Sequence, residues 1–176
     1  MSHHAHQAYY SNTRIALHWL SAIVIIWACI TGFGASFFPK QSAIRHFFDI
    51  VNPQLTAVFI PFFGWRVALY LRSRPCREWP RAVAQERLAL IVHALLYAII
   101  ITVLLTGLLM MPSPWALLGV FPILTLDIFH NQLFFIHKIS CVGLVALIGL
   151  HLTGVLYHLR QKRPILNKMR LSSENI

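Results

Sequence analysis

The chain has 176 residues, of which 57% are hydrophobic and only 11% are charged, and its formal net charge is +10. Soluble domains carry about 25% charged residues, so a chain with so few charges has too little polar surface to face water on all sides. Together with a mean hydropathy of +0.64, this composition excludes an ordinary soluble domain and predicts a membrane protein.

Four apolar segments follow one another along the chain, and each is close to the length of about 20 residues that a membrane-spanning helix needs. The second contains Pro53 and Pro61. Membrane helices tolerate proline when neighbouring groups satisfy the freed carbonyl groups, so we expect this span to start late or to be kinked. The sequence predicts an all-α integral membrane four-helix bundle in a single domain, residues 1–176, with spans at about 15–38, 47–71, 88–111 and 133–158.

Basic residues gather in two segments, one between the second and third spans and one after the fourth span. They are Arg72, Arg74, Arg77, Arg81 and Arg87, followed by Arg160, Lys162, Arg163, Lys168 and Arg170. By the positive-inside rule, this distribution places both termini and the middle loop in the cytoplasm. A membrane face this basic is expected to contact anionic lipid, and nucleic acid is not expected as a partner.

The fourth span contains two histidines at membrane depth, where ionisable residues are costly and usually functional. His137 and His151 are 14 residues apart, which places them on nearly the same side of a helix and about 21 Å apart along its axis. His18 lies about one turn inside the first span, at the same depth as His151. Because imidazole is a ligand of haem iron, we expect His18 and His151 to hold one iron from two sides. Hydrogen bonding between helices is the alternative role of such histidines.

His137 needs a partner near the start of the second span, where the sequence offers His46 and, a turn and a half deeper, Asn52. An amide oxygen binds haem iron weakly compared with imidazole, so His46 is the expected ligand. This expectation requires the regular helix to begin near Asn52, with His46 on a stretch that folds back over the haem. A second haem that is altered or missing is the alternative.

Three further polar residues lie near the cytoplasmic ends of the spans. His93 is expected to hydrogen-bond a haem propionate or a quinone carbonyl, or to pack against a neighbouring helix. Arg66 is expected either to extend to the lipid headgroups or to contact a propionate. His158 is expected at the membrane interface, with a propionate or quinone contact as its alternative role.

Three segments resemble the bacterial cytochrome b561 family, which is related to the b-type cytochrome subunits of hydrogenases and formate dehydrogenases. They are IALHWLSA in the first span, HALLY with TGLLMM in the third, and HKISCVGLVALIGLHLTGVLYH in the fourth. The resemblance covers about residues 14–158. It implies a four-helix cytochrome of the bacterial inner membrane with two non-covalent b haems, which passes electrons between a donor and a quinone. Some members oxidise superoxide and reduce ubiquinone, so this activity is a candidate here.

The resemblance also assigns haem ligands residue by residue. The family's ligand in the first span corresponds to His18, and its two ligands in the fourth span correspond to His137 and His151. Its ligand in the second span usually lies about four turns before an arginine. Counting 14 residues back from Arg66 reaches Asn52 instead of a histidine. The expected cofactor is therefore haem b, two per chain if the second site is formed and one if it is not.

Two other functions remain open at the level of sequence. One is a transporter or proton carrier that uses membrane histidines as relays and binds no haem. The other is a haem-binding membrane anchor subunit of a larger oxidoreductase. The sequence shows no nucleophilic triad, phosphate-binding loop or dinucleotide-binding fingerprint, so an enzyme that uses a soluble cofactor is not expected.

Overall fold

The computed structural model describes residues 11–72 and 84–161, and most of them form four long helices. Each of the four is long and apolar enough to cross a membrane, which confirms the prediction of an all-α fold with four candidate spans. The helices are α1 (Asn12–Gly34), α2 (Ala43–Arg72), α3 (Ala84–Leu109) and α4 (His130–Arg160). The shorter elements are η1 (Ala35–Phe37), β1 (Trp115–Leu117), β2 (Phe121–Ile123) and η3 (Asp127–Phe129).

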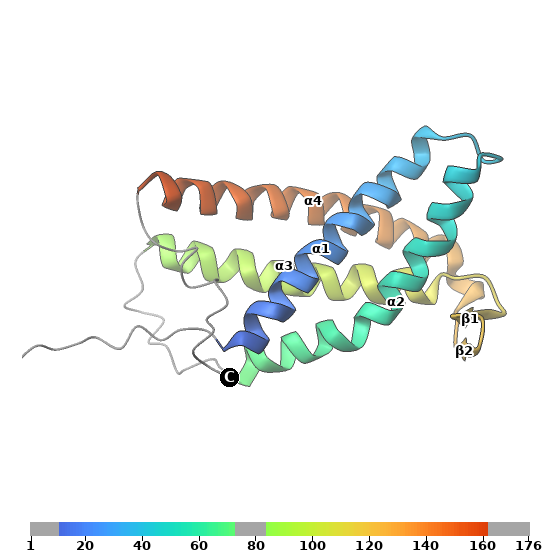
Figure 1. Cartoon of the computed structure of the whole chain (residues 1–176), viewed down its shortest axis with the longest axis horizontal. Coiled ribbons are helices and arrows are strands. Elements are labelled where there is room, and N and C mark those ends of the chain that lie inside the picture. The colour runs from blue at the N-terminus through green and yellow to red at the C-terminus, as the bar shows by residue number, and fades with distance from the viewer. Residues whose placement is uncertain (1–10, 73–83, 162–176) are drawn as a thin grey trace, which may run out of the picture.

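Successive helices run in opposite directions along the bundle (Figure 1). The start of α1, the end of α2, the start of α3 and the end of α4 therefore lie at one end. We call it the basic end, because the end of α2, the start of α3 and the end of α4 adjoin the segments rich in Arg and Lys. The connection from α1 to α2 and the β1–β2 hairpin lie at the other end, which we call the hairpin end.

The helices pack mainly as two pairs, α1 with α2 and α3 with α4, and α2 joins the pairs by contacting α3. Within the described residues, α1 and α4 do not pack closely along each other. In the most apolar window of each span, at most 22% of the residues are buried inside the bundle. The remaining apolar side chains face outward, as they do when lipid covers a helix. The buried apolar cluster at the centre consists of Val24, Phe59, Phe63, Ile100, Leu104 and Leu144.

α2 begins at Ala43, so the expectation that its regular helix starts only near Asn52 is wrong. Ser42 explains the early start, because its Oγ accepts a hydrogen bond of 3.2 Å from the backbone N–H of Arg45. A serine in this position caps the first turn of a helix by satisfying a free N–H group. The apolar run of the second span begins later than the helix that carries it.

The same helix continues through Pro53 and Pro61. Figure 1 shows that α2 changes direction along its length. Kinks in helices are found mostly at proline, which cannot donate a backbone hydrogen bond and whose ring crowds the preceding turn. The expectation of a kinked second span is confirmed.

The connection between α3 and α4 contains a short antiparallel hairpin that the sequence did not predict. β1 pairs with β2, with Leu117 opposite Phe121. The side chain of Gln54 in α2 makes two hydrogen bonds to this hairpin. Its Nε2 donates to the carbonyl oxygen of Ala116 (3.1 Å), and its Oε1 accepts from the N–H of Leu118 (2.7 Å). The hairpin is therefore fastened to α2 at the hairpin end of the bundle.

Candidate haem-binding site

Four polar residues, one from each long helix, gather toward the basic end. Nη2 of Arg66 lies 3.0 Å from Nδ1 of His18. The rings of His93 and His151 are 5.0 Å apart and nearly perpendicular. His18 is close enough to His93 and His151 to interact electrostatically with both. The structure thus brings His18 and His151 to one level of the bundle, and we call the four residues the basic-end layer.

Arg66 is turned into the bundle and not toward the lipid headgroups. Besides His18, its guanidinium contacts the ring of Tyr97, with Cζ 5.2 Å from the ring centroid. Tyr97 stacks in turn on Tyr70, with centroids 4.5 Å apart. A cation over an aromatic face is attracted by the negative charge of that face. This contact stabilises a positive charge beside the imidazole of His18.

A second layer lies 14 residues further toward the hairpin end. This spacing advances about 21 Å along a helix and returns to nearly the same face. The spacing that the four helices share is the signal that identifies the residues of this layer, two of which are glycines. The hairpin-end layer consists of Gly32, Asn52, Gly107 and His137.

His137 packs against α3 through both a hydrogen bond and a glycine. Its Nδ1 lies 3.1 Å from the carbonyl oxygen of Val103 and 3.1 Å from Oγ1 of Thr106. A Cβ atom at Gly107 would stand only 3.0 Å from Cε1 of His137. Because a carbonyl oxygen only accepts, Nδ1 carries the hydrogen and the neutral ring keeps its lone pair on Nε2. This is the tautomer that a metal-binding histidine uses when its Nδ1–H is held by a carbonyl group.

Asn52 stands on the α1 side of the same layer. Its Nδ2 is 3.7 Å from the position of a Cβ atom at Gly32. Its Oδ1 is buried and has no hydrogen-bond partner among the described residues. Buried polar atoms in proteins are nearly always hydrogen-bonded. The amide oxygen of Asn52 is therefore an exception that a bound group could explain.

Apolar side chains separate the two layers. Phe59, Ile100 and Leu144 are all buried, and each lies seven residues from both layers along its own helix. Seven residues correspond to about 10 Å of helix. The interior of the bundle therefore alternates between a polar layer, an apolar layer and a second polar layer.

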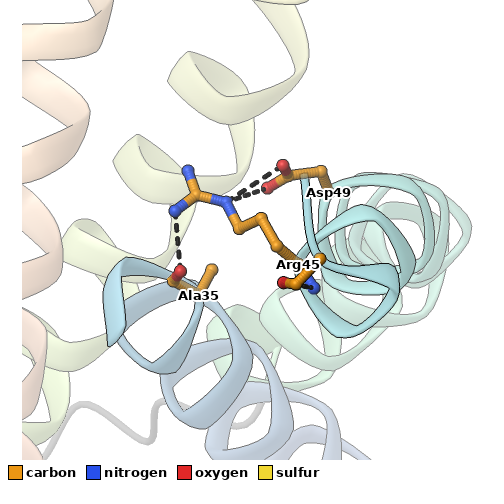
Figure 2. A network of polar contacts seen from close by, with 4 residues as sticks. Ala35, Arg45 and Asp49 are labelled. Carbon is orange, nitrogen blue, oxygen red and sulfur yellow. Dashed lines mark hydrogen bonds and ion pairs between the residues drawn. The ribbon is translucent and has the colours of Figure 1, made fainter. Parts of the chain in front are cut away.

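His46 lies in the first turn of α2 and is exposed. The contacts around it hold that turn in helical form (Figure 2). Nε of Arg45 pairs with Oδ2 of Asp49 one turn away (3.0 Å), and Nη1 of Arg45 donates to the carbonyl oxygen of Ala35 (2.6 Å). No contact joins His46 to His137 in the part of the chain that the structure describes. The structure does not bring these two histidines together.

His158 lies seven residues beyond His151 on α4. That spacing places it within about 20° of the same helix face, about 10 Å closer to the end of the helix. Its Nδ1 is buried and has no hydrogen-bond partner within the described ranges. His158 therefore faces the interior between the basic-end layer and the end of α4, and its Nδ1 is free to hydrogen-bond a bound group.

The two layers differ in whether their side chains can ligate a haem iron from two sides. Haem iron takes four nitrogen atoms from its porphyrin, so two imidazoles from facing helices complete it. The basic-end layer fits, because His18 and His151 come from α1 and α4, which are not packed closely together, and Arg66 adds a cation. The hairpin-end layer has a single imidazole and does not fit a haem with two histidine ligands. Within the described residues, no group of three or more His, Cys, Asp or Glu side chains could hold a metal ion without a porphyrin.

Four spanning helices with facing imidazoles at one level define a membrane-bound haem protein. The chain matches the family model described as prokaryotic cytochrome b561 over residues 9–170, and it belongs to that family. Its members are membrane cytochromes that bind b-type haem and transfer electrons. Membership contradicts the alternative of a transporter without haem. None of the curated proteins compared with the chain matches it.

Proposed function

We propose that this protein is a b-type cytochrome of the bacterial inner membrane that passes electrons from a donor to the quinone pool, with both termini in the cytoplasm. The observation that carries the proposal is the basic-end layer, where His18 and His151 meet Arg66 and His93. Each of these side chains comes from a different helix, so the folded bundle is needed to assemble them. The positive-inside distribution of Arg and Lys supports the orientation.

His18 and His151 are proposed to hold the haem iron at the basic end. When bound, the haem supplies one-electron transfer. Ligation of the iron by both imidazoles would leave no position for oxygen and would therefore favour electron transfer. Arg66 supplies positive charge for a propionate carboxylate, and the ring of Tyr97 holds the guanidinium in place.

The quinone is proposed to bind at the basic end, next to this haem. The buried Nδ1 of His158 lacks a partner among the described residues, so it is available to a quinone carbonyl oxygen. His93 lies in the first half of α3 and the exposed Arg160 is the last residue of α4, so both lie toward the basic end. A hydrophobic carrier enters from the lipid, and two electrons with two protons convert one quinone into one quinol.

Superoxide is the donor for which the family resemblance gives a precedent. Each superoxide anion loses one electron and becomes dioxygen, so two superoxide anions supply the electrons for one quinone. A soluble redox protein is the other kind of donor, and in that case the chain would serve as its haem-binding membrane anchor.

Rapid mixing of the reduced cytochrome with quinone tests the proposal. The purified protein is placed in liposomes, reduced with limiting dithionite and mixed with a short-chain ubiquinone. We expect a b-type spectrum whose reduced bands disappear at a rate that increases with quinone concentration. A rate independent of quinone would contradict the assigned acceptor, and the absence of a haem spectrum would contradict the function as a whole. Haem reduction that requires a copurifying soluble protein would instead indicate the anchor role.

A further inference from the structure

We propose that the hairpin-end layer is a haem site with one histidine ligand, His137, and that Asn52 occupies the position where a second imidazole would be needed. Iron at this site would keep one coordination position open to a small ligand, such as water or a diatomic molecule. The inference rests on the proposed function, because it assumes that the bundle binds haem.

His137 is already arranged as a ligand. The hydrogen bond from its Nδ1 to the Val103 carbonyl oxygen (3.1 Å) fixes the tautomer that leaves Nε2 unprotonated. Gly107 allows the ring to lie against α3, since a Cβ atom there would come within 3.0 Å of Cε1. Within the described residues, Nε2 has no hydrogen-bond partner, so its lone pair is available.

The register of α2 identifies the residue opposite this ligand. Arg66 faces His18 in the basic-end layer, and Asn52 lies 14 residues earlier on the same continuous helix. In a straight helix fourteen residues return to within about 40° of the same face, about 21 Å further along. Across the kink of α2, Asn52 still faces α1, with Nδ2 3.7 Å from the position of a Cβ atom at Gly32, as Arg66 faces His18 of α1. His137 has the same relation to His151. Asn52 and His137 therefore lie at the same depth of the bundle, and each faces its interior, as a pair of ligands would.

His46 does not lie at the depth and on the helix face that a partner of His137 would need. It lies six residues before Asn52, which turns it by about 120° around the helix and moves it about 9 Å further toward the hairpin end. To reach the layer, the first turn of α2 would have to unwind. That change would break the contacts of Arg45 with Asp49 and with the Ala35 carbonyl oxygen (Figure 2).

The side-chain amide of Asn52 could hydrogen-bond a small ligand at the open coordination position. An amide oxygen is a weak ligand for haem iron, but an amide group can both donate and accept a hydrogen bond. Its Oδ1 is buried without a partner among the described residues, and Gly32 opposite carries no side chain. A water molecule bound beside Asn52 could donate a hydrogen bond to Oδ1, whereas a diatomic ligand could accept one from the Nδ2 group.

Carbon monoxide distinguishes an open haem from one with two histidine ligands, because it binds reduced iron only where an axial position is free or weakly held. We expect the full-length wild-type protein to contain two haems and to bind about one carbon monoxide per two haems. Asn52→His should remove the carbon monoxide difference spectrum while the haem content stays unchanged. His46→Ala is the matched control, and it should keep both haems and the same carbon monoxide binding.

Other outcomes overturn the inference without ambiguity. Two haems with no carbon monoxide binding would mean that the polypeptide supplies a second ligand. If carbon monoxide then binds to the His46→Ala protein, that ligand is His46. One haem per wild-type chain would mean that the hairpin-end layer binds none, while the proposed function at the basic end would survive. A chain without any haem would overturn the proposed function as well.

Discussion

Nη2 of Arg66 lies 3.0 Å from Nδ1 of His18 and links α2 to α1 at the basic end. A guanidinium group only donates, so Nδ1 of His18 is the acceptor and the hydrogen of the neutral ring resides on Nε2. Iron binding needs a lone pair on the coordinating nitrogen, so ligation through Nε2 requires the imidazole to release Arg66. The released guanidinium is then free to pair with an anionic group of the cofactor.

Removal of the charge of Arg66 should lower the midpoint potential of the basic-end haem. A nearby cation favours the reduced haem, which carries one positive charge less than the oxidised haem. We expect Arg66→Gln to lower the midpoint potential by roughly tens of millivolts at protein-like dielectric constants. Arg66→Lys, which retains the charge, should show a much smaller decrease. A redox titration checks this, and equal potentials in Arg66→Gln and the wild type would place Arg66 away from the haem.

A methyl group at Gly107 should displace His137. The added Cβ atom would lie 3.0 Å from Cε1 of His137, whereas a Cβ atom at Gly64 of α2 would meet nothing within 4 Å. Both substitutions improve helix propensity by about 1 kcal/mol, so the difference between them isolates the contact with the imidazole. We expect the haem-to-protein ratio to fall in Gly107→Ala and to stay at the wild-type value in Gly64→Ala. Two haems with an unaltered spectrum in both variants would argue against His137 as a ligand.

Residues at the basic end should control reoxidation by quinone. Replacement of His93 or His158 by Ala, or of Arg160 by Gln, removes a hydrogen-bond donor from the proposed quinone site. We expect slower reoxidation of the reduced haem in at least one variant, with its haem content unchanged, when each is mixed with a short-chain ubiquinone. Kinetics identical to the wild type in all three variants would remove the quinone site from this end of the bundle.

Gln54 should stabilise the β1–β2 hairpin. Its side chain makes two hydrogen bonds, of 3.1 Å to Ala116 and 2.7 Å to Leu118, and each contributes about 1 kcal/mol. We expect Gln54→Leu to increase amide hydrogen exchange across residues 115–123 by roughly thirtyfold, which corresponds to about 2 kcal/mol. Substitution of the exposed Gln161 by Leu is the control. Unchanged exchange in Gln54→Leu would show that the hairpin holds its position without α2.

Hydropathy was sufficient to predict the four spans, because a membrane helix must bury a long apolar run whatever its neighbours are. The start of α2 was missed, since Arg45 and His46 interrupt the apolar run in its first turn. The signal that could have found it is Ser42, which caps the helix ahead of Arg45. The hairpin was missed for a different reason. Leu118 adopts a positive φ of 54°, which is uncommon for a residue with a side chain and depends here on the distant Gln54.

Within the candidate site, helix periodicity predicted that His18 and His151 lie at one depth, because that needs only the spacing within each span. It could not predict which way Arg66 turns. A long side chain near a helix end can reach the headgroups or a neighbouring helix, and the choice depends on His18 and Tyr97 as tertiary neighbours. The match of Gly32 and Gly107 to the second layer likewise became visible only once the helices were aligned.

Haem content and optical spectrum of His151→Ala test most directly whether the basic-end layer binds haem. His158→Ala is a matched control, because it removes an imidazole from the same face of α4, one layer away. We expect His151→Ala to insert into the membrane and to lose the haem with two histidine ligands, while His158→Ala keeps the wild-type haem content. A His151→Ala protein with the full wild-type haem content and an unchanged low-spin spectrum would contradict the assignment of His18 and His151 as the ligand pair.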